Sequence, residues 1–174
     1  MFYSLIYDVS TGAVLSPHFW GVKPNMLPSN EVECTQEQAE NPTLWRVVNG
    51  AVAASLSAAI AAKITALSNA CAAQIVSGFT SSALGAVHTY ASNPIDQQNI
   101  VQSAQSNNGG LLSCQDSSGI WARRPHTKVQ AQQALEDFVT ARDAVRLKLA
   151  RLEAKAEAAT TIEEVQAIVW ESDK

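Results

Sequence analysis

Residues Gly78–Ile100 read GFTSSALGAVHTYASNPIDQQNI, and this stretch sets the pattern for the middle of the chain. Phe79–Ser81 and Ala86–Tyr90 are short runs of β-prone residues joined through Leu84-Gly85, so they predict a β-hairpin. Asn93-Pro94 then opens a helix, because proline is well tolerated in the first helical turn. A hairpin placed directly between two helices predicts a fold that mixes both kinds of element.

The same alternation continues on both sides of this stretch. Before it, apolar residues recur every three or four positions from Val52 to Ile75, which predicts a helix that ends near Ser77-Gly78. After it, Asn107–Gly110 ends the second helix, and the runs at Leu111–Ser113 and Ile120–Ala122 predict a second hairpin. The middle of the chain therefore predicts helix, hairpin, helix and hairpin in that order.

The start of the chain shows strand and turn signals. Phe2–Tyr7 and Val14-Leu15 lie on either side of the turn residues Ser10–Gly12 and predict a hairpin. An irregular segment follows, because three prolines exclude a helix there: Pro17, Pro24 and Pro28.

Two local signals complete this N-terminal part. Thr35 and Gln38 have the spacing of a capping box, which predicts the start of a short helix. Asn49-Gly50 lies between the apolar runs Leu44–Val48 and Ala51-Val52, and this dipeptide readily takes the positive φ angles of a tight hairpin turn.

A long helix is predicted from Thr127 to Ala158, where nothing interrupts the helical pattern. One face of it has alternating spacings of three and four, as in a coiled coil; its members are Leu135, Phe138, Arg142, Val145, Leu149, Leu152 and Ala156. This seam either packs on the Ala51–Ile75 helix of the same molecule or joins copies of the chain. Capping boxes at Thr160–Glu164 predict a last short helix, which would hold Val165, Ile168, Val169 and Trp170.

Together these elements predict an α+β fold that is predominantly helical. We expect a small β-rich N-terminal unit over residues 1–50 and a helical domain with inserted β-hairpins over residues 51–174. The second domain would run helix, hairpin, helix, hairpin, long helix and short C-terminal helix.

The composition and net charge argue against some classes of function. The formal net charge is −4 and the pI near 5.3, which argues against a nucleic-acid-binding surface with its basic patch. Much of the apolar fraction of 47% is alanine, while aromatic residues make up only 6%. Large apolar anchors are therefore scarce, which favours thin helix packing or burial completed by a partner chain.

The cellular setting follows from the cysteines and the apolar runs. Cys34, Cys71 and Cys114 are odd in number and far apart, which fits a reducing compartment. The N-terminus has the pattern of a strand and not of a signal peptide. We expect no membrane span, because the alanine-rich stretch Ala51–Ala73 is interrupted by Lys63 and several polar residues.

No motif indicates catalysis or a bound cofactor. The three histidines, His18, His88 and His126, lie far apart in the sequence, so a metal site is not expected. Phosphate-binding and dinucleotide-binding fingerprints are absent, and so is any signature around the cysteines. His88 and Tyr90 share one face of a predicted strand, which either binds a ligand or packs on the helix that begins at Pro94.

From about Lys63 to Trp170 the chain resembles a phage and prophage family of domains of unknown function that are encoded beside tail-fibre and baseplate genes. The resemblance rests on the helix that runs into Gly78-Phe79 and on four further segments: Val87–Tyr90, Asp96–Ile100, Ile120-Trp121 and Ala158–Ile168. The β-rich start, with Tyr7-Asp8, Thr11-Gly12 and Val48–Gly50, is similar to the starts of many tail-fibre-associated proteins.

This resemblance implies a non-enzymatic tail protein that works by docking. It would be a structural adaptor in the virion tail, bound to a tail-fibre or baseplate protein, or alternatively an assembly chaperone in the host cytoplasm; a small enzyme with an unrecognised site is the lesser alternative. Aromatic anchors dominate many interfaces, so Phe19, Trp20 and Trp45 are candidate contacts. Leu149 and Leu152 are candidates for a homo-oligomeric seam.

Overall fold

The computed structural model describes residues 1–171, and this part of the chain holds five helices and three β-sheets. Helix accounts for 46% and strand for 25%, so the expectation of a predominantly helical fold is wrong. The fold is a mixed α+β one, and strand continues through segments for which the sequence predicted loops. Two compact units divide the chain: the first holds Met1–Ile64 and Lys155–Val169, and the second holds Thr65–Ala154 with the described residues from Trp170 on.

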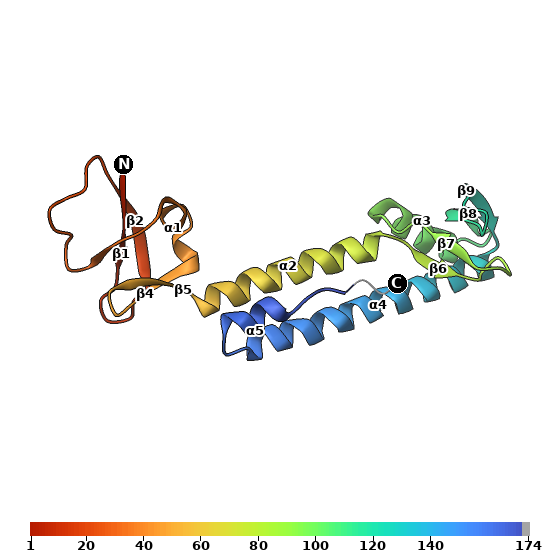
Figure 1. The fold of residues 1–174 in the computed structure, drawn as a ribbon. Coiled ribbons are helices and arrows are strands. Elements are labelled where there is room, and N and C mark those ends of the chain that lie inside the picture. The colour runs from red at the N-terminus through yellow and green to blue at the C-terminus, as the bar shows by residue number, and fades with distance from the viewer. Residues whose placement is uncertain (172–174) are drawn as a thin grey trace. The chain divides into compact units, whose positions relative to one another are not determined.

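The first unit begins with a three-stranded antiparallel sheet in the order β2-β1-β3 (Figure 1). Its strands are β1 (Phe2–Tyr7), β2 (Val14–Trp20) and β3 (Glu31–Glu33). β2 passes through Pro17, where an irregular segment was expected. It tolerates this proline because it is an edge strand of the sheet.

One short helix, one 3-10 turn and a two-stranded sheet follow the first sheet along the chain. The helix α1 (Gln36–Glu40) has the predicted capping box between Thr35 and Gln38, and the 3-10 turn η1 (Pro42–Leu44) follows it. β4 (Trp45–Val48) pairs with β5 (Ala51–Ala54). Both turn residues, Asn49 and Gly50, have positive φ angles, so the predicted Asn-Gly hairpin is confirmed.

Helical segments make up the rest of the first unit. They are the start of α2 (Leu56–Val76), the end of α4 (Lys128–Ala158) and α5 (Ile162–Ala167). Val165 of α5 and Ala156 of α4 are buried, and the Lys63 ammonium of α2 donates to the Ile168 carbonyl at 2.8 Å. α5 ends before Ile168, so the last predicted helix is shorter than expected at its C-terminal end.

The second unit is built on one four-stranded antiparallel sheet in the order β6-β7-β8-β9. Its strands are β6 (Phe79–Ser81), β7 (His88–Tyr90), β8 (Gly110–Gln115) and β9 (Trp121–His126). The two predicted hairpins are present, and they join because Tyr90 of β7 pairs with Cys114 of β8. The helix α3 (Pro94–Gln105) connects β7 to β8 and is capped by the Asn93 side chain.

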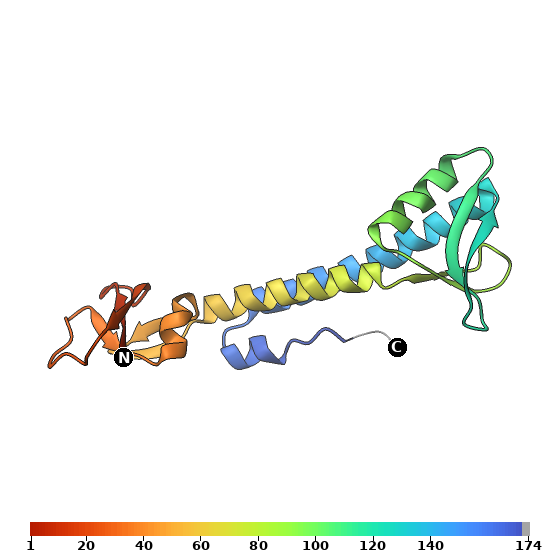
Figure 2. The same cartoon turned by 90° about the horizontal axis from the view of Figure 1, so that it is seen from above.

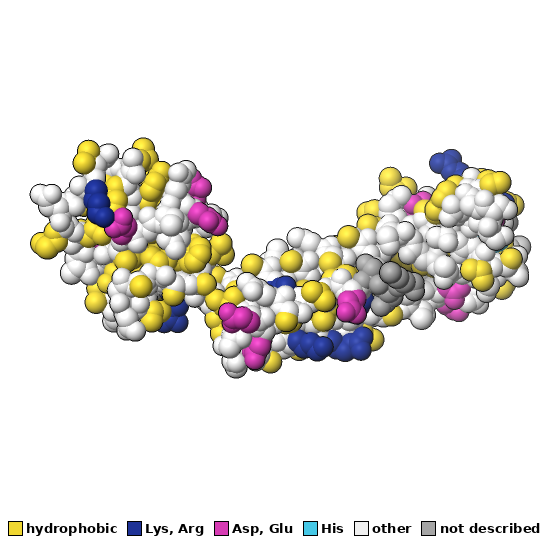
Figure 3. All heavy atoms as spheres, viewed as in Figure 1, with side chains coloured by type: hydrophobic (Ala, Val, Ile, Leu, Met, Phe, Trp, Pro, Cys, Tyr) yellow, Lys and Arg dark blue, Asp and Glu magenta, His cyan; other side chains and the backbone are white. Residues whose placement is uncertain are grey.

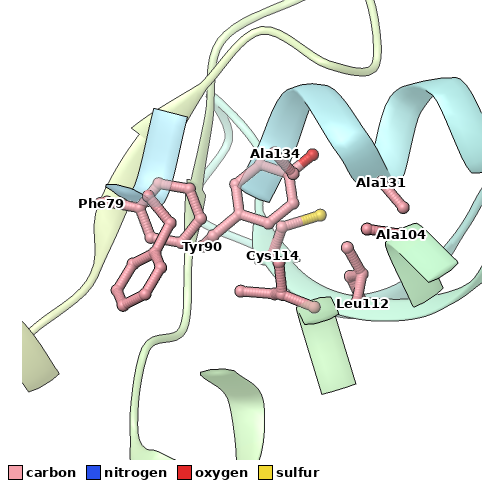
Figure 4. Close-up of a cluster of buried hydrophobic side chains, with 9 residues drawn as sticks. Phe79, Tyr90, Ala104, Leu112, Cys114, Ala131 and Ala134 are labelled. Atoms are coloured by element: carbon pink, nitrogen blue, oxygen red, sulfur yellow. The ribbon is translucent and has the colours of Figure 1, made fainter. Parts of the chain in front are cut away.

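The core of the second unit lies between this sheet, α3 and the first half of α4. Its buried members are Phe79, Tyr90, Ile100, Ala104, Leu112, Cys114, Ala131, Ala134 and Phe138. Figures 2 and 4 show the strands, α3 and α4 meeting at one end of α4, with these side chains gathered between them. Alanines on α3 and α4 let the helices come close to the sheet, while the aromatic rings fill the remaining volume.

Two aromatic contacts organise this core. The Phe79 ring stacks on Tyr90 at 5.3 Å between centroids and also contacts Phe138 at 5.4 Å. Tyr90 is fully buried, so the β7 face that carries it packs in the core. Because Phe138 belongs to α4, the long helix is tied to the strands by aromatic packing.

Candidate functional site

The five predicted interface residues divide between the two units. Phe19, Trp20 and Trp45 belong to the first unit, whereas Leu149 and Leu152 lie on α4 within the second. Phe19 and Trp20 are neighbours on β2 and therefore point to opposite faces of the sheet. The structure thus gives these residues different environments.

Phe19 is the most exposed of the five. Its side chain is 52% exposed, and its ring meets the Tyr3 ring edge-on at 5.8 Å. Tyr3 and Phe19 are directly opposite each other on β1 and β2, so the pair forms an aromatic ledge on one face of the sheet. An aromatic ring held in this way offers apolar area to a partner with little loss of side-chain freedom.

Further exposed apolar side chains belong to the same strand and the loop after it. Leu15 is the extra residue of a β-bulge opposite Tyr7 and is 66% exposed. Val22 and Met26 are more than four-fifths exposed, at 83% and 86%. Figure 3 shows apolar side chains spread over this part of the surface. We name Leu15, Phe19, Val22 and Met26 the β2 patch; the sequence pattern pointed only to Phe19.

Trp20 serves a different purpose on the other face of the sheet. Its indole Nε1 donates to the Ser4 hydroxyl at 2.9 Å, and its ring lies 4.2 Å from the His18 ring. Ser4 in turn donates to Glu31 at 2.6 Å. Trp20 is therefore half-buried in a hydrogen-bonded cluster of the first unit, which accounts for its place without a partner protein.

The cluster of Ser4, His18, Trp20 and Glu31 was not found from the sequence, because its members lie on three strands. The His18 Nδ1 donates to both Glu31 oxygens at 3.2 and 3.3 Å, and the Glu31 side chain is only 6% exposed. Burial by itself would raise the pKa of Glu31, but the hydrogen bonds from Ser4 and His18 outweigh it, so the pKa is lowered.

The order of these bonds does not suit nucleophilic catalysis. In a hydrolase triad the histidine stands between the hydroxyl and the carboxylate, so that it can take the hydroxyl proton. Here the Glu31 carboxylate stands between Ser4 and His18, and Ser4 is fully buried. The arrangement fixes the pairing of β1, β2 and β3 and offers no activated hydroxyl.

Trp45 and the α4 leucines are half-buried. Trp45 begins β4, and its indole Nε1 is buried without a hydrogen-bond partner among residues 1–171. Leu149 and Leu152 lie on the predicted seam, which is buried or half-buried along its whole length. Glu153 beside them accepts a long hydrogen bond from Ser68 of α2 at 3.4 Å, so within the second unit this side of α4 faces α2 of the same chain.

His126, Cys71 and Cys114 are buried in the structure. His126 is buried at the end of β9, where its Nδ1 donates to the Arg124 carbonyl and its Nε2 accepts from the Tyr90 hydroxyl. Burial raises the pKa of the Cys71 and Cys114 thiols, which disfavours the reactive thiolate. Across residues 1–171, no group of three or more His, Cys, Asp or Glu side chains is placed to hold a metal ion.

The helix α2 bears on the expectation of no membrane span, which stays a prediction. By length and composition alone it could cross a membrane, although the sequence suggested that Lys63 and the polar residues exclude this. One such helix is weak evidence, because the core helix of a soluble protein has the same length and composition.

Comparisons with known proteins found no relative of this chain. No protein-family model, curated protein or solved structure matches the chain.

Proposed function

We propose that the protein is a non-enzymatic structural adaptor of a bacteriophage tail, which docks to a tail-fibre or baseplate protein through its first unit. The observation that carries the proposal is the β2 patch, in which the half-exposed Phe19 ring is braced by Tyr3. The resemblance of Lys63–Trp170 to the phage tail-cluster family supplies the class of partner.

The patch suits docking by side chains and not by strand addition. β2 is an edge strand, and an edge can recruit a strand from another chain through its free N–H and C=O groups. Pro17 lies in the middle of β2 and has no N–H to donate, which interrupts such a ladder. A partner would therefore use the apolar side chains of the patch and gain little from backbone pairing.

Burying apolar surface contributes roughly 25 cal/mol per Å², and a few central aromatic residues commonly carry most of the binding energy. Phe19 is the one aromatic member of the β2 patch, so its removal should cost more than removal of any other member.

Two experiments test the proposal: mass spectrometry of purified phage particles, and a pull-down of the fibre protein that is encoded nearest to this chain. An adaptor is present in finished particles and retains the fibre protein; Phe19→Ser weakens retention by about tenfold or more, the scale of a central interface residue. Val87→Ser, which removes an exposed valine of the second unit, is the control and leaves retention unchanged. Absence from the particles with binding only to newly made fibre would identify an assembly chaperone instead.

A further inference from the structure

A cationic hollow lies in the second unit, between the C-terminal end of α2 and the middle of α4. Its volume is about 540 Å³. Arg142, Lys148 and Arg151 line the α4 side, and no acidic side chain of residues 1–171 is among its lining. In a chain with a formal net charge of −4, a hollow whose described charged lining is entirely cationic differs in sign from the chain as a whole.

The two arginines keep donors for a further partner. The Asp143 carboxylate accepts a hydrogen bond from the Arg142 Nε at 3.0 Å and lies 2.9 Å from one terminal nitrogen of the same guanidinium. Within residues 1–171, the other terminal nitrogen makes no hydrogen bond. Among residues 1–171, the one hydrogen bond of the Arg151 side chain is a long one, 3.4 Å from its Nε to the Leu147 carbonyl of its own helix. A guanidinium has five N–H donors, so both retain the capacity to bind an anionic group.

Helix capping does not account for these cations. The C-terminal carbonyls of a helix attract positive charge, and the end of α2 forms the other side of the hollow. However, Gln74 O already accepts from the Ser77 backbone and hydroxyl, and Ile75 O accepts from the Ser92 hydroxyl at 2.7 Å. Serines thus satisfy these carbonyls, and the arginine side chains are not required for that purpose.

The hollow also has an apolar floor and an aromatic rim. Phe79 and Phe138 of the core line it, and the Arg142 guanidinium lies 5.9 Å from the Phe138 ring centre. At the rim, the Trp170 indole donates to the Gln74 side chain at 2.9 Å, and the Lys148 ammonium lies 5.2 Å from its ring. These contacts hold the lining side chains in defined positions before any ligand arrives.

We propose that this hollow binds an acidic segment of a partner protein, with Arg142 and Arg151 taking carboxylates. The two arginines are nine positions apart on α4, which is about 13.5 Å along the helix axis and half a turn around it at ~3.6 residues per turn. Both nevertheless line the same hollow, so one extended segment with two or more carboxylates spans them. This inference rests on the proposed docking function for the kind of partner, and it adds a second contact that recognises charge.

The test uses the full chain and a fluorescein-labelled oligoglutamate peptide as the probe, with anisotropy as the readout. Oligoglutamate binds at low ionic strength and weakens as salt is added, whereas an oligoglutamine peptide of equal length does not bind. Arg151→Gln and Arg142→Gln each weaken binding by about tenfold, the scale of a lost charge-assisted hydrogen bond. Arg151 is exposed, so its variant tests the site even if Arg142→Gln perturbs packing.

The matched control is Arg146→Gln, which removes the same charge from the same helix but lies outside the hollow. Equal loss in Arg146→Gln, equal binding of oligoglutamine, or no binding of oligoglutamate would each overturn the inference. Inorganic phosphate that binds as tightly as the peptide would also overturn it, by indicating a free-anion site. If oligoglutamate does not bind but the fibre protein still binds through Phe19, this inference is wrong and the proposed function stands. If oligoglutamate binds but the fibre protein does not, the proposed function is wrong and the acidic-segment site stands.

Discussion

The Tyr90 hydroxyl donates to the Nε2 of His126 across 2.7 Å inside the core of the second unit. His126 Nδ1 lies 2.9 Å from the Arg124 carbonyl, which can only accept, so Nδ1 carries the proton and Nε2 is the acceptor. Both side chains are almost fully buried, at 0% and 3% exposed. This pair fastens β7 to β9 across the middle of the sheet.

Removing the Tyr90 hydroxyl should destabilise the second unit. Tyr90→Phe leaves the buried Nε2 of His126 without a donor, and an unsatisfied buried polar group costs about 1–3 kcal/mol. Urea denaturation measures this loss. Tyr7→Phe is the control, since Tyr7 makes an exposed 3.3 Å hydrogen bond to Ser29, and it should change the free energy of unfolding by less than about 0.5 kcal/mol.

The same pair makes stability depend on pH. Burial lowers the pKa of His126 below the ordinary 6.5, so the folded state prefers neutral histidine and the unfolded state binds more protons. This contribution is complete above pH 6.5 and is lost as the pH falls through the folded-state pKa, with a slope of up to about 1.4 kcal/mol per pH unit.

Denaturation at a series of pH values between 7 and 5 checks this expectation. The window lies above the pKa of the bonded carboxylates, because the pKa values of Glu31, Asp116 and Glu164 are all lowered. His126→Asn should flatten the slope, because it removes the group whose pKa burial lowers. An unchanged slope in His126→Asn would show that another group is responsible.

The hydrogen-bonded cluster of the first unit gives a third prediction. Ser4→Ala removes a donor from the nearly buried Glu31 carboxylate and the acceptor of the Trp20 indole, so we expect a loss of about 1–3 kcal/mol. The melting temperature and the Trp fluorescence of the full chain report it. Ser10→Ala breaks an exposed bond to Asp8 and should have little effect; equal losses in the two variants would contradict the structural role of the cluster.

A fourth prediction concerns whether the predicted seam of α4 packs within one molecule or joins two copies of the chain. Leu149→Asp places a carboxylate on the half-buried side of α4, and we expect a loss of about 2 kcal/mol in stability with no change in native mass. Leu147→Asp, two positions away and 65% exposed, is the control and should be nearly neutral. A fall in native mass for Leu149→Asp with the fold retained would show that the seam joins copies of the chain.

Local signals in the sequence were sufficient for much of the fold. Thr35 with Gln38 and Thr161 with Glu164 form the capping boxes that their spacing predicts. The Asn49-Gly50 turn and the long helix from Lys128 to Ala158 also follow from neighbouring residues. In each case the decisive interaction joins positions only a few residues apart.

Other features could not be predicted because they depend on distant pairings. β3 pairs with β1 only after a long loop, and the β7–β8 pairing that joins the two hairpins spans the whole of α3. Tertiary pairing therefore decides these features. The start of α2 at Leu56 was missed for a local reason, because the Asn49-Gly50 hairpin extends to Ala54 although the helical apolar pattern begins at Val52.

The candidate site shows the same division. Phe19 is half-exposed whereas the indole of Trp20 is bonded to Ser4, and nothing in the sequence distinguishes these two neighbouring aromatic residues. Similarly, Arg142 and Arg151 appear in the sequence among mixed charges, and only the position of α2 beside α4 makes them line one hollow.

Light scattering of the purified chain, alone and mixed with the fibre or baseplate protein encoded nearest to it, tests the docking proposal most directly. The account predicts a stable complex whose native mass corresponds to a whole number of copies of each protein. Phe19→Ser should abolish this complex, and Val87→Ser should leave it intact. A mixture in which both proteins keep their separate native masses would contradict it.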